Sequence, residues 1–316
     1  MTITLLADIG GTKTQLALVD ESANLSQPQY AINKDYARFE TLLEEYLPGK
    51  PQPDNAVIAV AGPVEHNRRC QMTNLPWLID GDSLTHQFQL KNVVVMNDLQ
   101  ATAWGLTDSR EQNRLRMLKG TQLDFDFPVV VISPGTGLGQ ACIYPNQNSY
   151  MIAATEGGHK TLAPFDPLSA QLVAQQWQKH SKPVSWENWF SGSGIGNLFR
   201  AMYPDQAAPP NEQIGKLAMQ DPDSDCGRLM ELFAKAIYAE AGNLVLQYLA
   251  WGGVIIAGGI PPKVESFFSN PQNINYLCRK NEYLDRLQAV PIALCLEQNI
   301  PIRGAAAYSQ QLLLKN

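Results

Sequence analysis

Residues 5–14 read Leu-Leu-Ala-Asp-Ile-Gly-Gly-Thr-Lys-Thr and lead into the apolar stretch 16–19. A second stretch of the same kind occupies residues 129–139, Val-Val-Val-Ile-Ser-Pro-Gly-Thr-Gly-Leu-Gly, and leads into apolar residues 141–144. Each predicts a strand, a tight turn and a second strand, because β-branched residues flank a glycine cluster. Such a turn directs backbone N–H groups to one point, and its glycines let a phosphate approach closely. Two of them predict a protein that holds a polyphosphate from both sides.

The commoner nucleotide-binding motifs are absent. Neither Gly-Lys pair, at 49–50 and 215–216, is followed by serine or threonine, so no P-loop is present. A dinucleotide fingerprint that began at Gly135 would require glycine at the position of Gln140. A Rossmann dehydrogenase is therefore disfavoured.

Composition restricts the class of protein. The 316 residues are 45% hydrophobic and 17% charged, with a net charge of −6, which is typical of a globular enzyme of two domains. Nucleic-acid binding is disfavoured because no basic cluster exists. The start lacks the basic residues of a signal peptide, and every apolar run is too short for a membrane span. The odd, scattered cysteines predict reduced thiols in a cytoplasmic protein without structural zinc: Cys70, Cys142, Cys226, Cys278 and Cys295.

Alternating strand-like and helix-like runs predict an α/β fold. We place a domain boundary near Asp108, where a polar stretch precedes the second strand–turn–strand unit. Apolar residues three or four apart over 230–248 predict a long helix with one buried face. The buried strand 254–257 then leads into Gly258-Gly259, and small residues over 303–309 predict a closely packed final helix. The two glycine turns suggest that both domains share one strand pattern.

Asp98 is the strongest candidate for an acid–base group. It follows the strand 93–96 and Asn97 and opens an expected helix, at the sheet edge where α/β proteins bind ligands. The alternative is that Asp98 only caps that helix.

Three further polar residues fit the recognition of a hydroxyl-rich ligand. Glu156 and His159 flank two glycines after the strand 150–155, and Glu187 lies among aromatic residues before the glycine-rich segment 191–197. Each also has a purely structural explanation, because His159 could be a structural histidine and Glu187 could cap a helix.

Taken together, six ordered motifs resemble those of bacterial glucokinases, in the actin-like ATPase and hexokinase superfamily. They are Asp-Ile-Gly-Gly-Thr-Lys-Thr from Asp8, Asn97-Asp98, 135–139, 156–159, 191–194 and 257–259. The segment 72–77, with Asn74, also resembles a family segment near the sugar. The resemblance covers the whole chain. It implies two actin-like, ribonuclease H-like α/β lobes with mixed sheets flanked by helices and a cleft between them. The small lobe would comprise 1–108 and 300–316, and the large lobe 109–299.

The resemblance also implies a role for each residue. Asp98 would be the general base that takes a proton from the 6-hydroxyl of glucose as that oxygen attacks the γ-phosphate of ATP. Asp8 would hold Mg²⁺ through water. The other sugar hydroxyls would be held by Asn74, Asn97, Glu156, His159 and Glu187. The ATP phosphates would lie against Gly10, Gly11, Thr12 and Lys13 on one side and Gly135, Thr136 and Gly137 on the other, with Gly258 and Gly259 lining the adenosine.

Several alternatives remain open. A kinase for mannose, fructose or an N-acetylhexosamine would keep Asp98 and change the groups that face the sugar. A sugar sensor without activity would bind glucose and ATP but have no need for the base. No cysteine lies between Cys142 and Cys226, so the zinc-bearing branch of related sugar kinases is not matched. The family also implies a homodimer, which the sequence does not decide. The choice of donor among ATP, polyphosphate and ADP stays open, because glycine turns bind the phosphates of any nucleoside triphosphate alike and related enzymes use polyphosphate or ADP.

Overall fold

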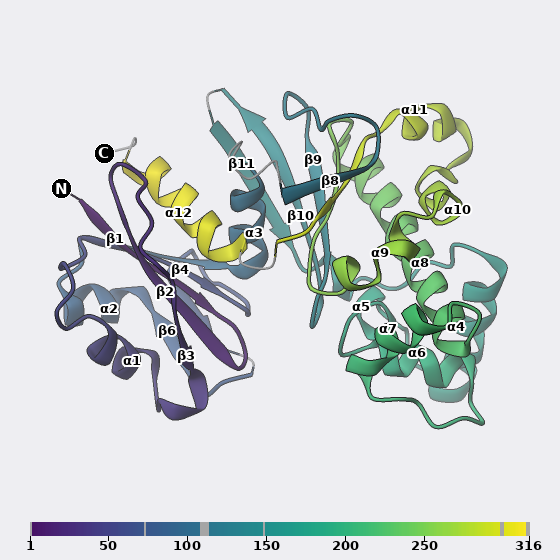
Figure 1. The fold of residues 1–316 in the computed structure, drawn as a ribbon, viewed down its shortest axis with the longest axis horizontal. Helices are drawn as coiled ribbons and strands as arrows, with labels where there is room; N and C mark the ends of the chain where they lie inside the picture. Colours follow the sequence, from purple (N-terminus) through teal and green to yellow (C-terminus); the bar gives the residue numbers. More distant parts are fainter. Residues whose placement is uncertain (1, 73, 108–113, 148, 298–299, 314–316) are drawn as a thin grey trace. The chain divides into compact units, whose positions relative to one another are not determined.

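The computed structural model describes residues 2–72, 74–107, 114–147, 149–297 and 300–313 (Figure 1). The chain divides into two compact units, which we call the first and the second unit. The first consists of Met1–Gln112 and Asn299–Asn316, and the second of Asn113–Gln298. The C-terminal helix thus belongs with the N-terminal residues. The predicted boundary near Asp108 lies outside the described residues.

The first unit is built on a five-stranded mixed sheet in the order β3-β2-β1-β4-β7. β1, β2 and β3 are antiparallel, whereas β4 and β7 continue the sheet parallel to β1. Its elements are β1 (Ile3–Ile9), β2 (Lys13–Asp20), β3 (Gln29–Ile32), η1 (Asn33–Asp35), α1 (Phe39–Tyr46), β4 (Asn55–Val60), β5 (Arg69–Gln71), β6 (Leu78–Asp80), α2 (Gly81–Phe88), β7 (Asn92–Asn97), α3 (Asp98–Leu106) and α12 (Ile300–Leu313).

Two helical layers cover this sheet. Leu5, Ala7 and Ile9 on β1 are fully buried and form one core with α1 and α2. Successive strand residues point to opposite faces, so Asp8 points to the other face, which α3 and α12 cover (Figure 1). There α12 packs very closely on α3, because a Cβ at Gly304 would lie only 1.6 Å from the carbonyl oxygen of Ala101. The small residues of the final helix have the packing role that the sequence predicts.

The second unit repeats this topology in a six-stranded sheet, β11-β10-β9-β12-β13-β8. β9, β10 and β11 are antiparallel, β12 and β13 continue parallel to β9, and β8 adds an antiparallel edge. The predicted common strand pattern is therefore confirmed. Its strands are β8 (Leu115–Lys119), β9 (Val129–Pro134), β10 (Leu138–Asn146), β11 (Ser149–Thr155), β12 (Gly253–Ile256) and β13 (Ile292–Cys295).

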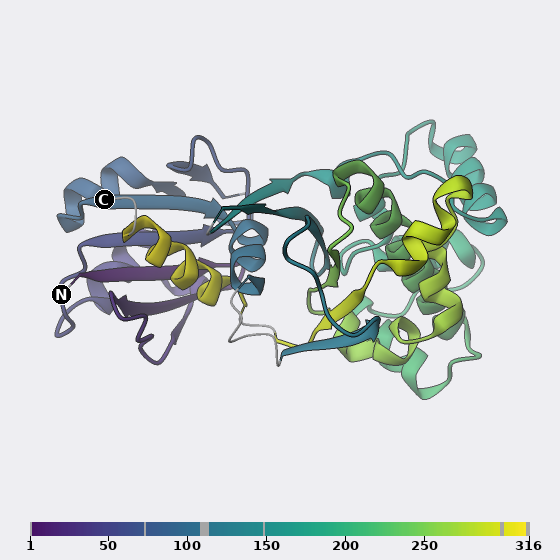
Figure 2. The same cartoon turned by 90° about the horizontal axis from the view of Figure 1, so that it is seen from above.

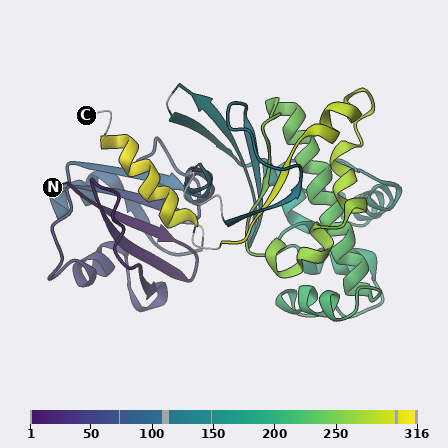
Figure 3. The same cartoon turned by 45° about the horizontal axis from the view of Figure 1, so that its top comes forward.

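The helices of the second unit gather on one side of its sheet (Figures 2 and 3). They are η3 (Gly157–His159), α4 (Pro167–His180), α5 (Trp186–Trp189), α6 (Ile195–Met202), α7 (Asn211–Gln220), α8 (Asp225–Tyr248), η4 (Pro261–Val264), α9 (Glu265–Phe268), α10 (Pro271–Ile274), η5 (Asn275–Cys278), η6 (Asn281–Tyr283) and α11 (Leu284–Ala289). The predicted long helix is α8, which begins at Asp225 because the Ser224 side chain accepts a hydrogen bond from the N–H of Gly227. Its apolar face, including Met230, Phe233 and Ile237, is fully buried against the sheet and the neighbouring helices.

All five cysteines are buried, and none of them forms a disulfide. Among the described residues, no helix combines the length and the apolar composition that crossing a membrane requires.

Candidate active site

The first glycine turn joins β1 to β2 and is held by one buried asparagine. The Asn33 amide donates a hydrogen bond to the carbonyl oxygen of Gly10 at 2.8 Å, and its backbone N–H donates to that of Thr12 at 3.0 Å. Thr14 Oγ1 donates to Asn33 Oδ1 at 2.7 Å. Asn33 therefore fixes both ends of the turn. No local pattern predicts this role, because Asn33 lies in an ordinary polar stretch. Thr12 and Lys13 are exposed beside it.

Two carboxylates lie at the same edge of the first sheet. Asp8 is near the end of β1, and Asp98 directly follows β7, two strands away in the parallel part of the sheet. Burial, together with the smaller effect of the negative charge of Asp98, raises the pKa of Asp8 to about 7. A carboxyl group with a pKa near 7 readily loses its proton when a cation binds beside it, because the cation stabilises the carboxylate. The arrangement favours a magnesium ion, which binds one or two carboxylates and keeps several waters.

The side chains of Asn97 and Asp98 both accept a hydrogen bond at the start of α3. Asn97 Oδ1 accepts a hydrogen bond from the N–H of Leu99 at 2.9 Å, and Asp98 Oδ1 accepts from the same N–H at 2.8 Å. Asn97, rather than Asp98, is the N-cap residue. The Asn97 amide also donates to the carbonyl oxygen of Gly62, at 3.4 Å. Because Asn97 is the N-cap of α3, helix capping alone does not explain why residue 98 is an aspartate.

Asn74 lies beside the first glycine turn. A Cβ built at Gly11 would be 3.5 Å from Asn74 Cβ, an ordinary van der Waals distance. Asn74 is exposed, so its amide is accessible to a ligand at this turn.

The second glycine turn joins β9 to β10 and is fastened to the segment 191–194. The N–H of Gly192 donates to the carbonyl oxygen of Gly135 at 2.8 Å, and that of Ser193 donates to Thr136 at 3.0 Å. A Cβ at Gly192 would be only 2.9 Å from the Gly135 oxygen, so this close approach requires glycine. Inside the turn, the N–H of Gly135 donates to the carbonyl oxygen of Gly137 at 2.9 Å.

A third glycine loop lies beside the second. Gly258 has a φ of +87°, and a Cβ there would be 2.5 Å from the carbonyl oxygen of Pro134, at the end of β9. The N–H of Ala257 donates to Ile132, also on β9, at 2.9 Å. The fold therefore requires glycine at 258. In contrast, a Cβ at Gly135 or Gly259 would meet no atom within 4 Å. Neither of these two has a positive φ, so the protein's own packing does not explain them, whereas a bound nucleotide would.

Glu156, His159 and Glu187 come together next to the second turn. His159 Nε2 lies 3.8 Å from Glu156 Oε2 and 3.7 Å from Glu187 Oε1. The other oxygen of Glu187, Oε2, accepts a hydrogen bond from the N–H of Leu138 at 2.7 Å. Glu156 and His159 are exposed, and about a quarter of the Glu187 side chain is exposed. Glu187 does not cap a helix, because Ser185 is the N-cap of α5.

A buried carboxylate supports this cluster from α8. Glu240 is 1% exposed, and its Oε1 lies 2.7 Å from Nζ of Lys160, the residue after His159. The same oxygen accepts from the Gln140 amide at 3.0 Å, and Oε2 accepts from the Asn243 amide at 2.9 Å. The sequence reasoning missed Glu240, because a single carboxylate within a helical pattern does not reveal that it is buried.

The candidate residues thus form one set on each unit. The first unit carries Asp8, Gly10, Gly11, Thr12, Lys13, Asn74, Asn97 and Asp98. The second carries Gly135, Thr136, Gly137, Glu156, His159, Glu187, Gly258 and Gly259. Within the described residues, no three His, Cys, Asp or Glu side chains group as a metal site.

Comparisons with known proteins show the family to which the chain belongs. A family model for glucokinase matches residues 5–312. A glucokinase from Nostoc sp. is 30% identical over 345 residues, covering 99% of this chain and 100% of that protein. The crystal structure of a glucokinase from an Antarctic psychrotroph is 30% identical, with a TM-score of 0.85 and 98% of each chain covered. A ROK family glucokinase from Streptomyces griseus, solved in complex with glucose and AMPPNP, shares the fold at 20% identity, with a TM-score of 0.65 and 98% and 99% of the chains covered. The chain therefore belongs to the glucokinase family, whose reaction is the ATP-dependent phosphorylation of glucose.

Proposed function

We propose that Asp98 is the general base of this glucokinase reaction. The oxygen of the glucose 6-hydroxyl attacks the γ-phosphorus of ATP, its proton passes to the Asp98 carboxylate, and the bond to the ADP oxygen breaks. The position of Asp98 at the end of a parallel strand, across the sheet edge from Asp8, is the observation that carries this assignment. A positioned base of this kind contributes roughly 10²–10⁴-fold to the rate.

Asp8 is proposed to hold Mg²⁺ through water. The raised pKa of Asp8 favours this role, because a nearby cation stabilises the ionised carboxylate that burial and Asp98 disfavour. Bound Mg²⁺ would neutralise charge on the β- and γ-phosphates, as in other phosphoryl-transfer enzymes. Asp8 and Asp98 would then differ in role because one faces the cation and the other the acceptor hydroxyl.

The two glycine turns are proposed to bind the ATP phosphates, with Gly258 and Gly259 at the adenosine. The open space at Gly135 and Gly259 supports this, since a Cβ at either would contact nothing in the protein itself. The Streptomyces griseus protein was solved with AMPPNP, an ATP analogue, which also supports it.

The sugar hydroxyls are proposed to be bound by Glu156, His159 and Glu187 on the second unit and by Asn74 and Asn97 on the first. Two carboxylates around one imidazole, on glycine-rich backbone, offer several acceptors to a ligand rich in hydroxyl groups.

The experiment that tests this function is ADP release with Mg-ATP and a panel of glucose, mannose, fructose and N-acetylglucosamine. We expect turnover on glucose to exceed that on the other sugars. Faster turnover on another hexose would reassign the preferred sugar, and glucose binding without ADP release would contradict the assignment of a base. ADP and polyphosphate are tested as donors by measuring the sugar phosphate formed, because transfer from ADP releases AMP and transfer from polyphosphate releases a shortened polyphosphate.

A homodimer and a cytoplasmic location are further parts of this proposal. The family resemblance supports the dimer, and five buried cysteines without a disulfide support a reducing compartment. Sedimentation analysis of the purified chain tests the dimer directly, and fractionation of the source cells tests the location.

A further inference from the structure

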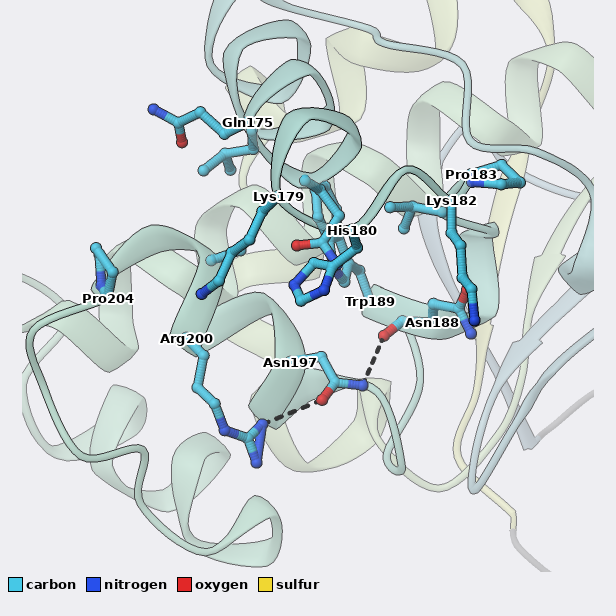
Figure 4. A pocket seen from close by; sticks show the side chains of 14 residues that line it. Gln175, Lys179, His180, Lys182, Pro183, Asn188, Trp189, Asn197, Arg200 and Pro204 are labelled. Carbon is cyan, nitrogen blue, oxygen red and sulfur yellow. Dashed lines mark hydrogen bonds between the residues drawn. The ribbon is translucent and has the colours of Figure 1, made fainter.

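A pocket of about 730 Å³ lies on the second unit, away from the residues assigned above (Figure 4). The C-terminal end of α4 and the following residues form one wall. Asn188 and Trp189 of α5 form a second, and residues of α6 form a third. Pockets of this volume accommodate small organic molecules.

The lining of this pocket is strongly basic. Lys179, His180, Lys182 and Arg200 line it, and no aspartate or glutamate does. The chain as a whole carries a net charge of −6, so this concentration of basic groups opposes the overall charge. A concave site with cationic groups and no carboxylate attracts anions.

The basic side chains come from three segments: Lys179 and His180 from α4, Lys182 from the residues after it, and Arg200 from α6. Figure 4 shows the Lys179 and His180 side chains extending from α4 toward the part of the pocket formed by α6. There Arg200 Nη1 donates to Asn197 Oδ1 at 3.1 Å, and Asn197 Nδ2 donates to the carbonyl oxygen of Asn188 at 3.3 Å. These two bonds orient the guanidinium while leaving its other donors for a ligand.

Stabilisation of α4 explains only two of the four basic residues that line the pocket. Lys179 and His180 are in the last turn of α4, where basic residues interact favourably with the helix dipole. Lys182 and Arg200 lie outside that helix. Within the described part of the chain, the Lys179 and Lys182 ammonium groups have no hydrogen-bond or ion-pair partner. The three permanently charged side chains, Lys179, Lys182 and Arg200, raise the positive potential of the pocket, and a bound anion would lower it.

We propose that this pocket binds a small organic phosphate. A phosphate group carries up to two charges and several acceptor oxygens, which match a guanidinium and ammonium groups better than a monocarboxylate does. The uncharged part of the ligand would lie against the exposed apolar residues of the lining, Pro183 and Pro204. The amides of Gln175 and Asn188 are available for its hydroxyl groups.

The same site is coupled to glucose binding through α5. Asn188 and Trp189 line the pocket, whereas the adjacent Glu187 accepts the Leu138 N–H beside the second glycine turn. α5 has only four residues, so a ligand that displaces Asn188 also moves Glu187. This coupling rests on the proposed role of Glu187 in binding sugar, whereas anion binding does not.

Isothermal titration calorimetry with fructose 1,6-bisphosphate and with inorganic phosphate as probes tests the proposal. Glucose and AMPPNP are present at saturation so that the active site is occupied. We expect saturable binding of the bisphosphate that weakens at higher salt, and at least ~10-fold weaker binding by the double variant Lys179→Gln, Arg200→Gln. Lys216→Gln, an exposed lysine on α7 outside the pocket, is the matched control and should bind as the wild type does.

Absence of saturable binding at millimolar probe, or equal loss in the Lys216→Gln control, would overturn the anion site. The circular dichroism spectrum of the double variant establishes that it is folded. The KM for glucose, measured with and without the bisphosphate, tests the coupling separately. A shift in the wild type that disappears in the double variant supports the coupling, and binding without any shift would overturn it while the anion site stands.

Discussion

The carboxylate of Glu187 accepts a hydrogen bond from the backbone N–H of Leu138 at 2.7 Å, and its other oxygen lies 3.7 Å from Nε2 of His159. Leu138 is the first residue after the second glycine turn. Glu187 therefore joins the turn proposed to bind phosphate to the group proposed to bind sugar. A change at this one carboxylate should affect how the protein binds glucose.

Substitution of Glu187 tests its proposed role with sugar. We expect Glu187→Gln to raise the KM for glucose by about tenfold, because hydrogen bonds to charged groups contribute about 1.5–3 kcal/mol. The KM for ATP should change little. Steady-state kinetics with each substrate varied in turn measures this, with Glu212→Gln, an exposed residue of α7, as the control. An unchanged KM for glucose would remove Glu187 from the sugar site.

Asp98→Asn tests the proposed base. We expect kcat to fall roughly 10²–10⁴-fold, because the amide cannot take the proton of the attacking hydroxyl. Glucose binding, measured by calorimetry, should persist. Asp82→Asn, an exposed aspartate of the same unit paired with Arg68, is the control and should keep its activity. A folded Asp98→Asn variant with near-normal kcat would contradict the assignment.

The raised pKa of Asp8 predicts a pH dependence of stability. In the unfolded chain Asp8 should titrate near 3.8, and in the folded protein it titrates near 7. Between these values the folded state holds a proton that the unfolded state has lost, so the free energy of unfolding contributed by Asp8 falls as the pH rises through this range. The full effect above pH 7 is at most about 4 kcal/mol.

Urea unfolding of the metal-free protein at several pH values measures this effect. Asp8→Asn should be stabilised relative to the wild type at pH 8, and the difference should shrink toward pH 5. Asp35→Asn, an exposed aspartate of the same unit, should show no such trend. Because Asp98 contributes to the raised pKa, Asp98→Asn should weaken the pH dependence. A constant difference between Asp8→Asn and the wild type would show that Asp8 ionises normally.

Two alanine substitutions in one turn should have different effects. A Cβ at Gly135 would meet no protein atom within 4 Å, whereas one at Gly137 would lie 2.5 Å from Glu187 Oε2. Gly135→Ala should therefore raise the KM for ATP, because the methyl group occupies the space proposed for phosphate. Gly137→Ala should mainly raise the KM for glucose, because it displaces Glu187. Both should unfold at wild-type temperatures in a thermal scan, and reversed kinetic effects would contradict the assignment of the turn.

The buried Glu240 should be important for stability. Glu240→Ala leaves Lys160 and two amides without their shared partner, and breaking a buried ion pair in this way costs about 3–5 kcal/mol. Since Lys160 is partly exposed, we expect the lower end of that range. On the same helix, Glu231→Ala removes only an exposed pair with Lys235 and should cost less than about 1 kcal/mol. Denaturant unfolding of both variants measures the difference, and equal costs would mean that the Glu240 network does not stabilise the fold.

Much of the fold could be predicted from local patterns. β-branched runs around glycines predict both hairpins, and apolar spacing predicts α8, because these elements depend on interactions between residues near in sequence. The order of the six motifs identified the family, and with it the candidate residues for the site. The strand-end position of Asp98 could also be predicted from its neighbours alone.

Other features depend on contacts between residues far apart in the chain. Asn33 reaches back 23 residues to hold Gly10, and Glu240 lies 100 residues from Gln140. Neither has a local signal, since a polar residue in a turn or a helix is usually exposed. The raised pKa of Asp8 likewise results from burial and from Asp98, 90 positions away in sequence and near it only after β1, β4 and β7 pair.

The sequence by itself therefore determined the hairpins, the glycine turns, the family and the chemical groups available for the reaction, because these depend on residue type and local order. Only the tertiary structure decided which groups meet: Glu187 with Leu138 and His159, Asn33 with the first turn, and the basic side chains of three segments around one pocket. The physical reason is that burial, and the strength of an interaction between charged or hydrogen-bonding groups, depend on distance in space. The distance in space between two groups is set only when the sheets and helices pack, and their separation along the chain does not determine it.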